Sequence, residues 1–271
     1  GTMTADSAYW NQEVVTQLML PGTTFTARYV PTEPGNWTLH CHFAFHTSHF
    51  LSTEQVPEPE DPGDPHGTDH TYRGMKGLLL PIQVTPREGG PRRPGEVAGA
   101  RPIRIVAQGR PAVYRDRIEG MAFIQTNGAD PAADALTIPS APLVLYRNRP
   151  VAITVVNRMR AATAVHWHGI ELPSWSDGVP GWSGGLPDVA PAIQPGDSFT
   201  ARFAPPRAGT FIYHAHSNEL HQIGSGLYGA LLVVDSASWN PARERIVIVG
   251  GDGFFSEGAR VNGSLTPAPI T

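Results

Sequence analysis

The sequence predicts an all-β protein, and three observations lead to this prediction. The 271 residues include 29 Gly and 27 Pro, a composition typical of many short strands joined by turns. Several segments alternate apolar and polar side chains, as half-buried strands do. One segment with the pattern of a β-hairpin occurs twice. The length is sufficient for one large or two ordinary domains with a sizeable core.

The repeated hairpin is the clearest structural unit in the sequence. Residues 21–42 align without gaps on residues 195–216, and 10 of the 22 aligned positions are identical. Each copy contains a Pro-Gly turn, an alternating strand, a second turn at Gly35 or Gly209, and a second strand that ends in His-x-His. The repeat therefore predicts the same hairpin in two successive domains.

The surroundings of the two copies predict the domain organisation. The second copy is preceded by further predicted strands, so residues 88–238 are expected to form a complete β domain; those strands cover residues 103–106, 143–146, 151–156 and 164–172. Their counterparts in the first copy would fall before residue 1, so residues 1–87 are expected to be the C-terminal half of another domain. Residues 239–271, with a strand predicted over 244–250, are expected to be a linker or the start of a further domain.

An insertion separates the first hairpin from the strand that follows it. Residues of about 52–73 are acidic and rich in proline, which predicts a surface loop without regular structure. Over the whole chain the formal net charge is −4 and the basic residues are scattered, so neither nucleic acid nor a membrane surface is an expected partner. No run approaches the length of a membrane helix, and the N-terminal residues do not indicate a compartment.

Three His-x-His pairs indicate a metal site. Residues i and i+2 of a strand project to the same face, so each pair places two imidazoles side by side. A single pair is more often incidental, but three pairs, two of them on matched hairpins, favour metal binding. The pairs are His40/His42, His166/His168 and His214/His216.

The only cysteine lies inside the first pair. Cys41 cannot form an internal disulfide, so by composition it is a buried hydrophobe, a reactive thiol or a metal ligand. Its side chain should point to the opposite face of the strand from its two neighbours, and His46 is close enough in sequence to bind the same metal. Thiolate and imidazole ligands suit copper or zinc, and the paired histidines favour copper. Surface or non-ligand positions are expected for the remaining histidines, among them His49, His66, His70 and His221.

Three motifs together resemble those of the multicopper oxidases of laccase type. They are HCHFAFH at 40–46, HWHGIELPSWSDGV at 166–179 and YHAHSNELHQIGSGLYGALLV at 213–233. The resemblance implies cupredoxin-like Greek-key β-sandwiches, one complete and one partial. It also implies a type 1 copper that takes electrons from substrate and a trinuclear copper cluster that reduces dioxygen to water.

The resemblance assigns a role to each motif residue. It makes Cys41 and His46 type 1 ligands, with Cys41 also the route of electron transfer, and it makes His166 a type 2 ligand. The implied type 3 ligands are His40, His42, His168, His214 and His216. The axial type 1 position falls on Leu51, which would tend to raise the redox potential. Asp177 matches a family acid with a role in proton delivery, although an ordinary Asp-Gly turn residue explains it equally well.

The sequence also departs from the family pattern. It contains no H-P-x-H-x-H motif, which in the family supplies one ligand to each copper type. That half-site is therefore expected from another segment or another chain. The H-C-H motif precedes H-W-H-G, the order of multi-domain relatives that carry the cluster between internal domains. The resemblance suggests an exported bacterial protein, periplasmic or extracellular.

These observations favour a laccase-like oxidase that couples one-electron oxidation of phenols or amines, or of metal ions, to four-electron reduction of O₂. The expected partners are O₂ and a small reducing substrate. A non-catalytic or partially metallated copper-binding fragment is the alternative, because the H-P-x-H-x-H half-site is missing. A nitrite reductase-like protein is a third option, against which the three histidine pairs argue.

Overall fold

The computed structural model describes residues 3–5, 12–43, 46–47, 77–86, 94–111, 113, 119–235, 239–251 and 259–267. Strands dominate these residues, and the described helical elements are the short helix α2 (Glu219–Gly224) and the 3₁₀ turn η4 (Ser174–Ser176). None of the helices in these ranges is long and apolar enough to cross a membrane. The acidic loop at 52–73 lies outside the described residues, as do Leu51, His49, His66 and His70.

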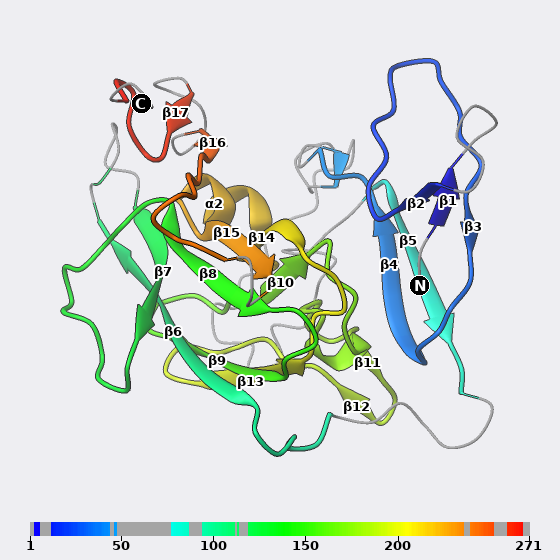
Figure 1. The fold of residues 1–271 in the computed structure, drawn as a ribbon, viewed down its shortest axis with the longest axis horizontal. Helices are drawn as coiled ribbons and strands as arrows, with labels where there is room; N and C mark the ends of the chain where they lie inside the picture. The colour runs from blue at the N-terminus through cyan, green and yellow to red at the C-terminus, as the bar shows by residue number, and fades with distance from the viewer. Residues whose placement is uncertain are drawn as a thin grey trace, which may run out of the picture.

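A sandwich of two four-stranded sheets forms the larger part of the fold (Figure 1). One sheet has the order β13-β9-β6-β7 and the other the order β10-β14-β15-β8. Each sheet contains one parallel pair, β6 with β9 and β15 with β8, and antiparallel pairs otherwise. This mixture gives the sandwich its cupredoxin-like Greek-key character. The strands are β6 (Arg101–Arg110), β7 (Gly120–Thr126), β8 (Ser140–Tyr146), β9 (Val151–Asn157), β10 (Val165–His168), β13 (Ser198–Phe203), β14 (Gly209–Ala215) and β15 (Tyr228–Val234).

The core of the sandwich orients the strands that carry histidines. Trp167 is 1% exposed and Ala215 is 0% exposed, and both belong to the apolar core between the sheets. Each lies between the two histidines of its motif, so alternation along the strand turns both imidazoles to the opposite face. Burial of the apolar side therefore fixes where the imidazoles point.

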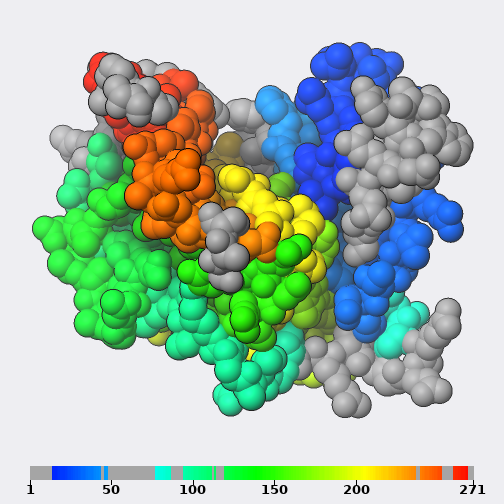
Figure 2. Space-filling view, in the orientation of Figure 1, coloured from blue at the N-terminus to red at the C-terminus, as the bar shows by residue number. Residues whose placement is uncertain are grey.

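The first repeat joins the sandwich through a shared sheet. Strand β4 (Gly35–His40) pairs with β5 (Leu79–Val84) on one edge and with β11 (Gly184–Gly185) on the other, and β12 (Asp188–Val189) completes the sheet. In the space-filling view, the blue N-terminal segment lies against the green and yellow part of the chain (Figure 2). The β4–β11 pairing therefore holds the His-Cys-His segment beside the other two histidine motifs.

Hydrogen bonds reinforce this junction. The Ser174 hydroxyl donates to the Asn36 carbonyl at 2.6 Å, and the Asn36 side-chain amide donates to the Trp182 carbonyl at 2.9 Å. The Trp182 indole donates to the Trp37 carbonyl at 3.1 Å. Gly35 has φ +135°, and a Cβ there would lie 2.5 Å from Ser174 Cβ, so only glycine fits this close approach.

The two copies of the repeated hairpin differ in their first strand. In the second copy this strand is β13, six residues long, whereas the first copy has only β3 (Arg28–Tyr29). β3 pairs with β1 (Met3–Ala5), which also pairs with β2 (Gln12–Val14). The second strands, β4 and β14, both lead into their histidine pairs as predicted.

Two predicted strands are wrong over most of their length. The strand predicted over 164–172 ends at His168, because Gly169 has φ +84° and turns the chain. Of residues 244–250, only Val249–Gly250 form a strand, β16, which pairs with β17 (Arg260–Val261). The Asn262 side chain accepts from Ile248 N–H at 2.8 Å and donates to the Ile246 carbonyl at 3.1 Å, so it occupies backbone groups that a strand partner would use.

Candidate metal centre

The three histidine pairs converge on one place, although the first pair lies more than 120 residues before the other two in sequence. The ring centroids of His42 and His168 are 4.2 Å apart, and those of His40 and His216 are 5.9 Å apart. His166 lies 5.4 Å from His214 and 5.1 Å from His216 by the same measure. The six imidazoles form a continuous group, which we call the histidine cluster.

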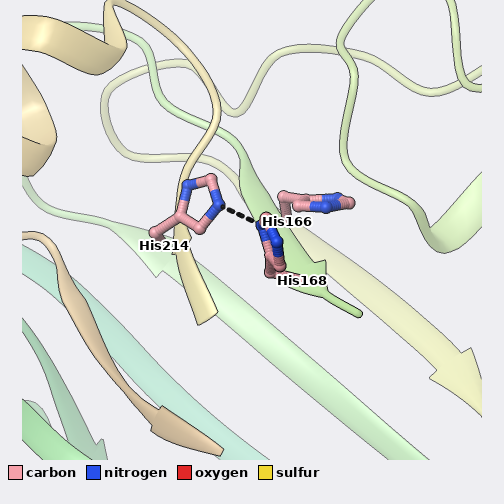
Figure 3. A group of neighbouring side chains, drawn as sticks. All are labelled: His166, His168 and His214. Atoms are coloured by element: carbon pink, nitrogen blue, oxygen red, sulfur yellow. Dashed lines mark hydrogen bonds between the residues drawn. The ribbon is translucent and has the colours of Figure 1, made fainter. Parts of the chain in front are cut away.

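Strand pairing explains four of these positions. β10 and β14 are antiparallel, with His166 directly opposite His214. Cross-strand neighbours on one face lie close enough for their side chains to interact. His168 Nδ1 and His214 Nε2 approach to 3.3 Å, and Figure 3 shows the two rings facing each other beside His166. The ligand nitrogens of these three residues lie within 4.8 Å of one another, which suits one metal ion or two adjacent ions.

Hydrogen bonds determine which ring nitrogens remain available. His40 Nδ1–H donates to the carbonyl of Cys41 at 3.0 Å, and His214 Nδ1–H donates to the carbonyl of Ala215 at 2.8 Å. His166 Nδ1–H donates to the carbonyl of Asp177 at 2.7 Å. In each ring the opposite nitrogen, Nε2, then carries the lone pair that a metal requires; that of His214 accepts from His168 Nδ1 while no metal is bound. The equivalent bonds of His40 and His214 follow from the repeated hairpin.

Burial keeps most of the cluster neutral. Desolvation lowers the pKa of His168 to about 2 and that of His214 to about 3, and the neighbouring imidazoles add to the effect. The pKa of His42 is lowered to about 4 for the same reasons. Burial also lowers the pKa of His166, but the Asp177 carboxylate outweighs it and leaves the pKa raised. Neutral imidazoles bind metals without first losing a proton, so the donor set fits a transition metal.

We expect the metal-free chain to lose stability as the pH falls from 7 to 5. The pKa values of His168 and His214 lie below the ordinary 6.5, so in this interval the unfolded chain binds protons that the folded chain does not. The free energy of unfolding should then fall by up to about 1.4 kcal/mol per pH unit for each imidazole. His166 and Glu219, whose pKa values are raised, oppose this trend.

Urea unfolding at pH 7, 6 and 5 in the presence of a chelator measures this loss. The double variant His168→Gln/His214→Gln should lose less stability over the same interval, because the two depressed groups are gone. Stability that stays constant or rises on acidification would contradict the electrostatic description of the cluster.

The Cys41 thiol contacts His46 and the backbone of Phe43. Its Sγ is 3.5 Å from His46 Nδ1, and the backbone N–H of Phe43 donates to Sγ at 3.4 Å. A thiolate and an imidazole at this distance suit a mononuclear copper site. Cys41 is directly bonded to His40 and His42, which belong to the cluster.

Asp177 holds His166 through two groups. Its carbonyl accepts the Nδ1–H bond, and its Oδ1 lies 3.4 Å from the same nitrogen. Its own N–H donates to the Ser174 carbonyl at the end of η4, and Gly178 follows with φ +91°. Asp177 is therefore part of a turn, and it also contacts His166 of the histidine cluster.

Sequence reasoning missed one residue of the cluster. Glu219 Oε1 lies 3.1 Å from His216 Nε2, and burial raises the pKa of this carboxyl group to about 7. Glu219 lies three residues after His216, at the start of α2, within the motif at 213–233, but the motif assigned it no role. His221 lies on the same helix.

Comparison with known proteins supports the interpretation of the motifs. A sequence profile described as multicopper oxidase matches residues 135–238, and a second profile of the same description matches residues 3–61. Together they cover more than half of the chain. The crystal structure of a multi-copper oxidase from Pseudomonas Thermotolerans is similar over 63% of this chain and 37% of its own, with TM-score 0.43 and 24% identity.

Curated relatives come from fungi and bacteria. Multicopper oxidase MCE of Talaromyces pinophilus is 42% identical over 97 residues, 35% of this chain and 15% of the relative. A copper resistance protein A homolog of Pseudomonas syringae is 37% identical over 132 residues, 46% of this chain and 21% of the relative. Laccase 1 of Metarhizium acridum is 39% identical over 111 residues, 40% and 16% respectively. The matched segments thus span about a fifth or less of these relatives. The chain belongs to the multicopper oxidase family.

Proposed function

We propose that this chain forms the copper-binding part of a laccase-like oxidase, which oxidises a small reducing substrate in one-electron steps and reduces O₂ to water. The observation that carries the proposal is the convergence of His40 and His42 with the pairs on β10 and β14. Cys41 and His46 form a separate thiolate–imidazole pair on the same strand segment. This is the arrangement that a mononuclear site linked to a multinuclear site requires.

The proposed ligand assignments follow the family resemblance. Cys41 and His46 would hold a type 1 copper, and His166, whose Nδ1 is held by Asp177, would present Nε2 to a type 2 copper. The proposed type 3 ligands are the remaining cluster residues, His40, His42, His168, His214 and His216. The close approach of His168 Nδ1 and His214 Nε2 supports their sharing one copper.

Bound copper would supply the one-electron redox chemistry. The chain would supply the path for the electrons and the groups that deliver protons. Electrons would leave the Cys41 thiolate through the covalent bonds that join it to His40 and His42. Asp177 lies against His166 and is proposed to hold and deliver a proton at its Oδ1. Phenols and amines are the proposed substrates, with metal ions as the other class.

The ligands absent from this sequence are proposed to come from another segment or chain that carries an H-P-x-H-x-H motif. We also propose that residues 1–87 belong to one domain, that residues 88–238 form a second, and that residues 239–271 are a linker or the start of a further domain. Export to the periplasm or the extracellular space is proposed from the resemblance. The relatives include fungal and bacterial proteins, so the chain is not assigned to either group.

A copper-binding module without turnover is the second candidate, because the sequence contains no H-P-x-H-x-H motif. It would hold fewer coppers than a complete oxidase and consume no O₂. A nitrite reductase-like site needs fewer histidines than the six that converge here, so the geometry favours it less.

Copper loading of the 271-residue chain tests the proposed function. We expect a strong blue absorption from the thiolate at Cys41, and Cys41→Ser should abolish it while copper in the histidine cluster is retained. O₂ consumption with a phenol then separates the oxidase from the module without turnover. A copper-loaded chain without the blue absorption would refute the type 1 assignment.

A further inference from the structure

A carboxylate of the chain lies against the histidine cluster and has no role in the ligand assignments above. Glu219 is the first residue of α2, and its Oε1 is 3.1 Å from His216 Nε2. The exposed fractions of the two side chains are 16% for Glu219 and 2% for His216. A carboxylate so placed needs a compensating partner, because a buried charge without one is costly.

The contact between these two groups is not a hydrogen bond. Among the described residues, neither His216 Nε2 nor Glu219 Oε1 has a hydrogen-bond partner, although 3.1 Å is close enough for one. The distance between Nε2 and Oε1 suits a hydrogen bond, but the angle between the two groups does not. Oε1 therefore lies to the side of the line along which Nε2 would donate a proton or bind a metal.

This geometry fits two ligands of a single metal ion. Donor atoms bound to one metal at about 2.0–2.2 Å, with an angle of about 90–110° between the bonds, lie about 2.8–3.5 Å apart. The distance of 3.1 Å between Nε2 and Oε1 falls within this range. A metal on the lone-pair axis of His216 would then be within bonding distance of the carboxylate.

Helix α2 holds Glu219 in this position. The buried Gln222 side chain donates to the Ala162 carbonyl at 2.8 Å and accepts from the Thr163 hydroxyl at 2.7 Å. Both partners immediately precede the strand that carries His166 and His168. The carboxylate is therefore fixed to the cluster through the same short segment of chain, as expected for a preorganised ligand.

We propose that Glu219 is an oxygen ligand of the copper ion held by His216, which gives that copper a mixed imidazole and carboxylate set. The inference rests on the proposed copper function of the cluster. A carboxylate oxygen is a harder donor than imidazole, so it should favour Cu(II) over Cu(I) at this position.

A crystal structure of the Cu(II)-loaded 271-residue chain measures the ligand bond directly. We expect an Oε1–copper distance of about 2.0–2.2 Å at the copper bound by His216. A distance beyond 3 Å at that copper would overturn the role of Glu219 while the proposed function stands. Absence of copper from the whole cluster would overturn both.

Cu(II) titration of variants provides the second measurement. Glu219→Gln keeps the size of the side chain and removes the charged oxygen, and we expect it to weaken Cu(II) binding at this site at least about tenfold. Glu244→Gln, which changes an exposed acid away from the cluster, should bind as the unmodified chain does. Equal Cu(II) affinity and an unchanged electron paramagnetic resonance spectrum in Glu219→Gln would overturn the proposal.

Discussion

Gly178→Ala is expected to destabilise the fold by about 3 kcal/mol or more, because the new side chain is both strained and sterically blocked. Gly178 has φ +91°, and a Cβ there would lie 2.0 Å from the carbonyl oxygen of Val165. That carbonyl belongs to β10, directly before His166, so relief of the clash must displace the strand that carries two cluster histidines. Copper binding should weaken together with stability.

Gly196→Ala is the matched control for this substitution. Gly196 has φ +87°, close to that of Gly178, but a Cβ there meets nothing within 4 Å. The control therefore carries the backbone strain alone, which we expect to cost about 1–2 kcal/mol. Urea unfolding of the two variants measures the difference, and equal losses of stability would contradict the close packing of Gly178 against β10.

His214→Ala is expected to weaken copper binding by the histidine cluster at least about 100-fold, since loss of a direct ligand should exceed the 10–100-fold cost of losing a supporting group. His214 Nε2 faces His168 Nδ1 at 3.3 Å, and its Nδ1 is anchored to the backbone, so the ring is held with Nε2 toward the cluster. Competition with a copper chelator measures the affinity.

His221→Ala is the control for the loss of an imidazole near the site. His221 lies on α2 and belongs to none of the three pairs. Copper affinity of this variant should stay within about threefold of that of the unmodified chain, well below the effect of a supporting group. Equal loss of affinity in the two variants would contradict the assignment of His214 as a ligand.

Only part of the candidate site follows from local sequence patterns. Strand alternation places His166 and His168 on one face, and the repeat predicts the matching position of His40 and His214; both features depend on local geometry. The His42–His168 contact depends on the pairing of β4 with β11. That pairing joins Asn36 to Gly184 across 148 residues, and no local pattern specifies it.

The wrong strand predictions also result from contacts between residues that are distant in sequence. The strand expected over 244–250 reads as an apolar alternation, but the Asn262 side chain bonds to the Ile248 N–H and the Ile246 carbonyl, which a strand partner would use. The short strand β3 has the same sequence pattern as β13, yet its partner is β1 and not a long neighbouring strand. Glu219 was missed because its role depends on the turn that places α2 beside His216.

We propose that two distant segments of the chain, which carry His42 and His168, share copper ions in one cluster. A double-mutant cycle on His42 and His168, whose ring centroids are 4.2 Å apart, tests this claim most directly. Copper per chain is measured by mass spectrometry for His42→Ala, His168→Ala and the double variant. If the two residues hold the same copper, the double variant should lose no more copper than either single variant. Losses that add would show that the two segments bind copper separately, and would contradict the account.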